Sequence, residues 1–325
     1  YQLYLKGRFY LTRLRPADKQ KGISYLQQAI AIDPNYALAY VGLANAYRLL
    51  ALAGDTPSSE VFPKSKAAAQ KAVELDDTLA EAHAVLGFTI YWYDWDWVAA
   101  ETHFKRALEL NPNSADAHWF YAVLFSNLGR HGEALAEIKR ARELDPLNLG
   151  INTSEGRMLI FAGKVDEGLD ALQGTLELDP NYFPALLFAS DAYILKGMYV
   201  EAVAEATKVR ELNADNSLAI AYSGFALAKS GKRAEARAAL EELLKLSTEH
   251  YVSPYHVALL YNGLGERDET LAWLERGFEH RDPKMVFLNL EPTWNNLRAE
   301  PRFQAWLIGF FAFNLIVAFA GFLIM

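Results

Sequence analysis

Hydrophobic and polar positions along this chain follow a pattern that repeats every 34 residues. Residues 113–146 read NSADAHWFYAVLFSNLGRHGEALAEIKRARELDP, and residues 147–180 read LNLGINTSEGRMLIFAGKVDEGLDALQGTLELDP. Both stretches end in Glu-Leu-Asp-Pro, and Pro112 precedes Pro146 by the same interval. A constant period of this length is typical of helix–turn–helix units, each of which hides its apolar face against its neighbours. The pattern therefore predicts an all-α fold, a solenoid of stacked helical hairpins.

The period places about eight unit ends along the chain. They fall near Pro34, Asp77, Pro112, Pro146, Pro180, Ala214, Thr248 and Asp282. The second unit is longer than the others, because the segment LAGDTPSSEVFP contains the Pro and Ser residues that mark an inter-helix loop. We expect the repeat array to cover residues 1–283 and C-terminal capping helices to cover residues 284–304.

The residues in these units resemble the tetratricopeptide repeat, whose pattern is W-x2-L-G-x2-Y, then A-x3-F, then a closing Pro. In the third unit, the matching positions hold His83, Leu86, Gly87, Ile90, Ala100, Phe104, Ala107 and Pro112, with histidine in the tryptophan position. The resemblance implies a right-handed superhelical solenoid in which the first helix of each unit lines a concave groove. It also implies a non-catalytic scaffold or assembly factor that binds partner proteins.

A narrower resemblance comes from the aromatic segment in the third unit. YDWDW, followed by AAETHFKRALELNP and AHWFYA, is similar to a bacterial subfamily of these arrays. Members of that subfamily are found C-terminal to winged-helix, TolB-like or Ser/Thr kinase domains, none of which is present in these 325 residues. The resemblance therefore leaves an alternative function open, the sensory and interaction half of a bacterial regulator.

The full aromatic segment, YWYDWDW at residues 91–97, has two interpretations. It lies in the turn of the third unit, which is one residue longer than the norm. Asp96 is placed to cap the following helix, because its carboxylate can accept from exposed backbone N–H groups there. The rings can then cover the seam with adjacent units, which is the interpretation we favour, since buried aromatics usually pack. The alternative is an aromatic box for a ligand.

A partner-binding groove is predicted on the first helices of the units, on the side that points away from the second helix. Its candidate residues are Asn45, Arg48, Phe88, Tyr91, Trp119, Phe120, Arg157, Asp191, Phe225 and Tyr255. Aromatic rings mixed with charged and amide groups suit an extended peptide or a helix. Two alternatives stay open: each ring can instead fill a gap between units, and the groove can instead bind a carbohydrate or small ligand.

The C-terminal end is strongly apolar. Residues 306–325, WLIGFFAFNLIVAFAGFLIM, contain no charged side chain, and as a helix they would span about 30 Å, the thickness of a bilayer core. We therefore expect a transmembrane helix at residues 305–325 that contacts the lipid bilayer as a single-pass C-terminal anchor. Gly309, Asn314 and Gly321 would pack closely against subunits of a membrane complex. Arg298 and Arg302 favour the cytoplasmic side for the array.

Composition and motif spacing narrow the chemistry. Lys and Arg number 32 against 40 Asp and Glu, and a net charge of −8 argues against nucleic acid as a partner. The absence of cysteine excludes thiolate metal sites and cysteine nucleophiles. HRDPKMVFLN at residues 280–289 has Phe287 where a kinase catalytic loop needs Asn, and the seven histidines lack metal-ligand spacing. We expect no catalytic residue, no metal and no cofactor.

Overall fold

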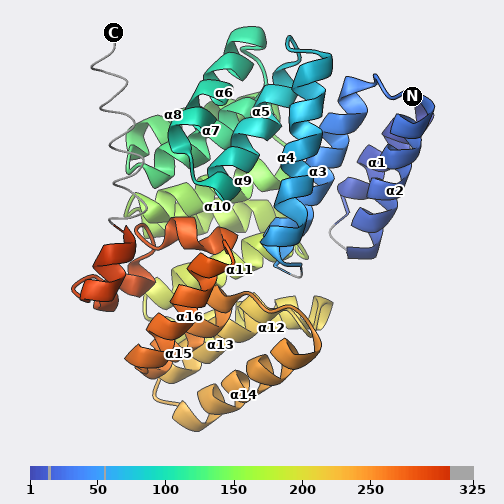
Figure 1. The fold of residues 1–325 in the computed structure, drawn as a ribbon. Helices are drawn as coiled ribbons and strands as arrows, with labels where there is room; N and C mark the ends of the chain where they lie inside the picture. Colours follow the sequence, from blue (N-terminus) through green and yellow to red (C-terminus); the bar gives the residue numbers. More distant parts are fainter. Residues whose placement is uncertain (14–15, 55, 308–325) are drawn as a thin grey trace. The chain divides into compact units, whose positions relative to one another are not determined.

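A computed structural model describes residues 1–13, 16–54 and 56–307, which are helical throughout apart from turns (Figure 1). The helices are α1 (Gln2–Leu11), α2 (Pro16–Ile32), α3 (Ala37–Ala53), α4 (Ser58–Leu75), α5 (Ala80–Thr89), α6 (Trp97–Leu110), α7 (Ala115–Asn127), α8 (His131–Leu144), α9 (Leu149–Phe161), α10 (Val165–Leu178), α11 (Phe183–Leu195), α12 (Tyr199–Leu212), α13 (Ser217–Lys229), α14 (Arg233–Glu249), α15 (Pro254–Leu264) and α16 (Arg267–Glu279). A π-helical turn follows α5, two 3₁₀ turns follow α16, and none of the described residues forms a strand. The helical-repeat part of the predicted fold fits this arrangement.

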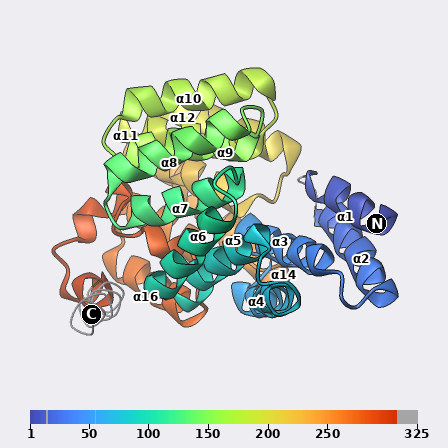
Figure 2. The same cartoon turned by 90° about the horizontal axis from the view of Figure 1, so that it is seen from above.

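Two compact units divide the described residues, unit 1 over residues 1–121 and unit 2 over residues 122–307. Within unit 1, α1 packs on α2, α3 on α4 and α5 on α6; within unit 2, the same holds for α9 with α10, α11 with α12, α13 with α14 and α15 with α16. Figure 2 shows these helices from above. Neighbouring hairpins of one unit also touch, for example α10 with α11 and α12 with α13. Each hairpin thus covers the apolar side of the next.

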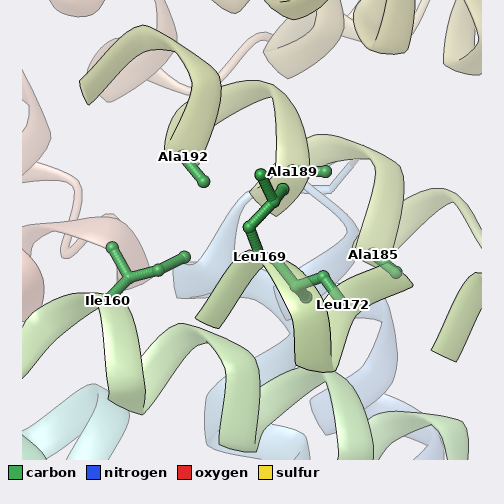
Figure 3. Close-up of a cluster of buried hydrophobic side chains, with 6 residues drawn as sticks. All are labelled: Ile160, Leu169, Leu172, Ala185, Ala189 and Ala192. Atoms are coloured by element: carbon green, nitrogen blue, oxygen red, sulfur yellow. The ribbon is translucent and has the colours of Figure 1, made fainter. Parts of the chain in front are cut away.

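A cluster of buried aliphatic side chains shows how two hairpins of unit 2 join. Its members are Ile160, Leu169, Leu172, Ala185, Ala189 and Ala192, from α9, α10 and α11 (Figure 3). Large side chains from α9 and α10 meet small ones from α11, so that the helices approach closely. Removing these apolar surfaces from water is the main favourable term in packing the hairpins.

The helices α9 and α10 touch through their backbones at a pair of glycines. A Cβ added at Gly168 would lie 2.6 Å from the Gly156 carbonyl oxygen and 2.7 Å from Ile160 Cγ1. The same helix carries Gly174, where an added Cβ would meet nothing within 4 Å. Gly168 is therefore required for the close packing of α10 on α9, whereas Gly174 is not.

We expect Gly168→Ala to lower the free energy of unfolding of unit 2 by about 1–3 kcal/mol, because the new methyl group must displace backbone. Gly174→Ala should raise it by about 0.5–1 kcal/mol, since alanine is the better helix former. Urea denaturation followed by circular dichroism measures both. Equal effects at the two positions would contradict the close approach of α9 and α10.

The turn inside each hairpin shows a second 34-residue period. Five glycines in the left-handed region of φ occupy it: Gly129, Gly163, Gly197, Gly231 and Gly265. Thirty-four residues before Gly129 stands Trp95, which has φ 61° although it is not a glycine. Left-handed backbone is costly for a side chain with a Cβ. The aromatic segment therefore holds a turn that the five following hairpins make with glycine.

The extra residue of the third unit is absorbed by the π-helical turn Ile90–Asp94. Just after it, Asp96 Oδ1 accepts from the Ala99 backbone N–H at 3.0 Å and caps α6, which confirms the cap predicted from the sequence. The Tyr91 side chain is fully buried and Trp97 is 2% exposed. Tyr91, Trp92 and Trp97 therefore pack inside unit 1, in line with the packing interpretation, whereas Tyr93 and Trp95 are half-buried.

The transmembrane part of the predicted fold and the single-pass localisation are wrong. Within the described residues, no helix is both long and apolar enough to cross a membrane. An apolar helix such as α11 has 13 residues and so spans about 20 Å, short of the bilayer core of about 30 Å. Its apolar side chains face neighbouring helices instead. The predicted packing residues Gly309, Asn314 and Gly321 lie outside the described residues.

Candidate partner-binding faces

Four of the residues predicted for the groove meet on one side of unit 1. Arg48 of α3 lies over the ring of Phe88 from α5 at 4.6 Å and over the ring of Phe120 from α7 at 4.9 Å. The two rings are edge to face, with 4.6 Å between their centroids. Arg48 Nε donates to Asn45 Oδ1 at 3.1 Å. A guanidinium between two aromatic faces is a strong cation–π arrangement.

Arg48, Phe88 and Phe120 are only 7%, 3% and 2% exposed, so a partner can reach this cluster mainly through the half-buried Trp119 and Asn45. Burial lowers the pKa of Arg48 to about 10, and the nearby Asp116 carboxylate opposes that shift. The guanidinium therefore stays charged at neutral pH. Trp119, half-buried, extends the aromatic surface with its ring 5.3 Å from that of Phe120. We call Asn45, Arg48, Phe88, Trp119 and Phe120 the unit 1 face.

Tyr91 and Phe225 do not join the residues predicted beside them. The Tyr91 ring packs against Trp92 and Trp97, with centroids 5.4 and 6.2 Å away, and is fully buried. Phe225 of α13 is 3% exposed and packs where α15 approaches, since a Cβ on Gly263 would lie 2.9 Å from the Phe225 Cα. Both side chains serve packing between helices, which is the alternative that the sequence left open for each ring.

In unit 2, the corresponding side of the first helices is covered by the chain itself. Residues 283–297, which we call the capping segment, contain the 3₁₀ turns Pro283–Phe287 and Pro292–Leu297. Glu291 of this segment accepts from Arg157 Nη2 of α9 at 2.9 Å, across 134 residues of sequence. Phe287 lies under the same guanidinium, 3.8 Å from its carbon to the ring centroid. Arg157 is thus paired and stacked by the capping segment.

Helix α15 holds the other end of the capping segment. Trp294 is fully buried, and its Nε1 donates to Tyr255 Oη at 3.1 Å and to Glu291 Oε2 at 3.2 Å. Tyr255 donates its hydroxyl proton to Glu291. Asn262 Nδ2 donates to the Thr293 carbonyl at 2.8 Å, and Asn296 Nδ2 donates to Asn262 Oδ1 at 2.7 Å. A carboxylate, an indole and a backbone carbonyl of the segment are therefore each recognised by α9 or α15.

Two further charged groups lie in the same cluster, and both have shifted pKa values. Burial, and then the Glu291 carboxylate, raise the pKa of Asp191 on α11 to about 7. Burial, and then the Arg157 guanidinium, lower the pKa of Lys284 in the capping segment to about 8. We call Arg157, Asp191, Tyr255 and Asn262 the unit 2 face. Near neutral pH, both Asp191 and Lys284 are close to a change of charge.

These pKa shifts predict how the stability of unit 2 varies with pH. The pKa of Asp191 is higher in the folded chain than in the unfolded one. Its contribution to the free energy of unfolding is therefore complete below about pH 4 and is lost as the pH rises through 7. The pKa of Lys284 is lower in the folded chain than in the unfolded one. Its contribution to the free energy of unfolding is therefore present at high pH and is lost as the pH falls towards 8. We expect the urea midpoint of the wild-type chain to fall more steeply between pH 5 and 7 than that of Asp191→Asn. Parallel curves for the two proteins would contradict the assignment.

The residues that contact the unit 2 face were not predicted from the sequence. Arg157, Asp191 and Tyr255 were predicted for the groove, but the capping segment was predicted only to cover the end of the repeat array. The sequence did contain a feature that indicates a buried segment. Phe287, Glu291 and Trp294 lie in a stretch without the 3.6-residue hydrophobic period of a helix, and this stretch has more large apolar side chains than a surface loop usually has. The residues that bind it were chosen for their helical position, which is independent of what covers them.

Histidines in the first helices link them to the preceding turn. His83 Nε2 lies 3.1 Å from the Asp77 carbonyl oxygen, and His118 Nε2 lies 3.0 Å from that of Pro112. Asn152 occupies the same position one repeat later and donates to the Pro146 carbonyl at 3.0 Å. Across the residues that the structure describes, no group of three or more His, Cys, Asp or Glu side chains is placed to hold a metal ion.

Comparisons with known proteins agree with the repeat pattern. Residues 88–148 match the family model of the tetratricopeptide repeat. The transcriptional regulator HilA of Salmonella typhimurium is 31% identical to this chain over 136 residues, which are 42% of this chain and 24% of HilA. The HilA protein of Salmonella typhi matches to the same extent. The chain thus spans about a quarter of the length of the curated relatives that it matches.

Two solved structures are similar to this chain at low sequence identity. Human IFIT1, solved as a dimer with PPP-AAAA, is 15% identical with a TM-score of 0.63, and the match covers 82% of this chain and 69% of IFIT1. YrrB, described as a TPR protein with an unusual peptide-binding site, is 24% identical over 60% of this chain and 95% of YrrB, with a TM-score of 0.38. The likeness to IFIT1 shows the helical-repeat fold alone.

Proposed function

This chain is a tetratricopeptide-repeat protein, and we propose that it is a non-catalytic protein-interaction module whose partner binds at the unit 1 face. The observation that carries the proposal is the charged Arg48, held between the Phe88 and Phe120 rings with Asn45 beside it. A charged guanidinium beside a half-buried amide and a half-buried indole suits a protein segment with an acidic or amide side chain among apolar ones. Trp119 would supply apolar contact and Asn45 would fix the register, while the buried Phe88 and Phe120 rings hold the guanidinium in place.

The half-buried Trp119 is where such a partner would make its first contact. Large amphipathic rings at low conformational cost are enriched at the centres of protein interfaces. The ring of Trp119 lies beside that of Phe120, and Asn45 contacts the Arg48 guanidinium. A partner bound here would therefore lie across the first helices of successive hairpins, α3, α5 and α7.

Site-specific photocrosslinking in cells tests this proposal. A benzoylphenylalanine placed at position 119 should capture a defined protein partner, and the matched control at Lys105 on α6, whose side chain is 60% exposed, should not. Asn45→Ala in the position-119 protein should reduce the adduct at equal expression. The proposal fails if both positions give the same adducts, or if Asn45→Ala leaves the yield unchanged while circular dichroism shows folded protein.

The match to HilA favours a second, more specific role for the same face. HilA is a transcriptional regulator, and the 136 residues that it shares with this chain are 31% identical. We propose that the repeats of the present chain act as the interaction half of a regulator. Changing Asn45 and Trp119 to alanine in the chromosomal gene should then alter the transcripts of a few operons. An unchanged transcript profile, with the photocrosslinked partner lost, would leave the interaction module and reject the regulatory role.

A further inference from the structure

The capping segment has the properties of a bound ligand rather than of one more repeat. It forms 3₁₀ turns, and these are held by side-chain contacts to α9 and α15 that reach far along the sequence. Helix α16 ends at Glu279, and Arg281, a non-glycine residue at φ 51°, lies between that helix and the segment. The connection is therefore a short turn with unfavourable backbone, unlike the glycine turns within the hairpins.

Recognition of the segment follows a simple chemical pattern. The carboxylate of Glu291 is read by Arg157 and Tyr255, and the indole of Trp294, three residues later, is buried against Tyr255 with ring centroids 5.3 Å apart. Asn262 reads the backbone between them through the Thr293 carbonyl. Side-chain pockets combined with a backbone contact are how repeat and groove proteins hold extended segments. The face thus selects an acid and, three residues later, an indole, which the segment presents in the sequence Glu-Pro-x-Trp.

The charges of the face do not fit the segment perfectly. Closure brings the Glu291 carboxylate towards the Asp191 carboxylate, and it brings Lys284 towards the Arg157 guanidinium. Each approach of like charges opposes closure, although Glu291 attracts Arg157 and Lys284 attracts Asp191. The like-charge approaches therefore offset part of the attraction that holds the segment closed.

From these observations we propose that the unit 2 face is a second docking site, for a partner segment with Glu-Pro-x-Trp chemistry, and that the capping segment is its built-in competitor. The apparent affinity for such a partner equals the intrinsic affinity multiplied by the fraction of chains whose face is open. The intact chain therefore binds weakly, and anything that loosens the capping segment strengthens binding. This site is distinct from the unit 1 face, so the two proposals succeed or fail separately.

Competition in the full chain tests the proposal. The probe is a fluorescein-labelled synthetic peptide of residues 283–300, titrated by fluorescence anisotropy. In the double variant Glu291→Ala/Trp294→Ala, the segment is weakened and the face is left intact, so the peptide should bind at least tenfold more tightly than it does to the wild-type chain. Adding Arg157→Ala to that variant should remove the gain, and so should the same two alanines placed in the peptide. No gain in the folded double variant would overturn the proposal.

Because the chain contains no cysteine, an engineered disulfide can hold the capping segment closed without side reactions of native thiols. Asn262 and Asn296 are in direct side-chain contact, so Asn262→Cys/Asn296→Cys should form a disulfide that holds the segment closed. In the Glu291→Ala/Trp294→Ala background, the oxidised form should bind the peptide more weakly than the same protein after reduction, a comparison in which the loss of Asn262 is common to both states. Equal binding before and after reduction, with the disulfide verified by mass spectrometry, would show that the peptide binds elsewhere and reject the site.

Hydrogen exchange on the wild-type chain tests opening without any substitution. If the capping segment opens as a unit, its amides should exchange at least tenfold faster than those in the middle of α15. Excess unlabelled peptide should then compete for the face and increase exchange in the segment further. Identical exchange of the segment and α15, unaffected by peptide, would mean that the segment leaves only when unit 2 unfolds, and the proposal would be wrong.

Discussion

Replacing Trp294 by alanine is expected to lower the free energy of unfolding of unit 2 by about 3–5 kcal/mol. The indole is fully buried, packs edge to face on Tyr255, and donates to both Tyr255 and Glu291. Its loss removes a large apolar surface and leaves a cavity that helices on either side fill only in part. Urea denaturation followed by circular dichroism, with protection of the chain from limited proteolysis, measures the effect.

Trp273 provides the matched control for this substitution. It also belongs to unit 2, on α16, but it is only half-buried and carries Arg276 over its ring at 4.4 Å. Trp273→Ala should therefore cost about 1 kcal/mol, close to the centre of measured single substitutions. If Trp294→Ala costs no more than Trp273→Ala, the capping segment is not packed as described.

Removing one partner of the Arg157–Glu291 pair is the second large effect. The two side chains are only 14% and 5% exposed, and a buried charge that loses its partner destabilises a protein by about 3–5 kcal/mol. Arg157→Met should therefore cause a loss of this size, because Glu291 stays buried next to Asp191. Replacing both residues, as in Arg157→Met/Glu291→Leu, should recover most of the loss, since no unpaired charge is then left inside.

The double-mutant cycle on this pair separates charge from shape. A surface pair of unit 2, Arg140 with Glu143, has side chains that are 44% and 51% exposed, and Arg140→Met should change stability by less than about 0.5 kcal/mol. Equal and additive losses for Arg157→Met and Glu291→Leu would contradict a direct coupling. The same urea titration, repeated at pH 7 in low and high salt, measures the cycle.

Much of the fold could be predicted from the sequence because its interactions are local and repeated. The 34-residue period predicted hairpins, and closing prolines such as Pro146 and Pro180 stand just after the ends of α8 and α10. Asp96 could be assigned as a cap because a cap bonds within its own first turn. The glycine turns, from Gly129 to Gly265, were readable in the same way although the period was first found through proline.

The errors and omissions have physical reasons of their own. Hydropathy counts apolar residues but does not reveal what covers them, and in this chain the described helices cover one another. The unit 1 face was predicted in part, since Arg48, Phe88 and Phe120 lie on the first helices of successive hairpins, although at different positions of the repeat. For Tyr91, the extra residue of the π-helical turn carries the ring into the interior, which a uniform period does not anticipate.

The sequence by itself determined that the chain folds into repeated helical hairpins, and it predicted one side of each first helix as the side for contacts. Only the tertiary structure decided that this side is occupied in unit 2, where Glu291 reaches Arg157 across 134 residues. The physical reason is the range of the interactions. Helix periods, caps and turns depend on residues within a few positions, whereas a buried salt bridge and a buried indole depend on which distant surfaces the folded chain brings together.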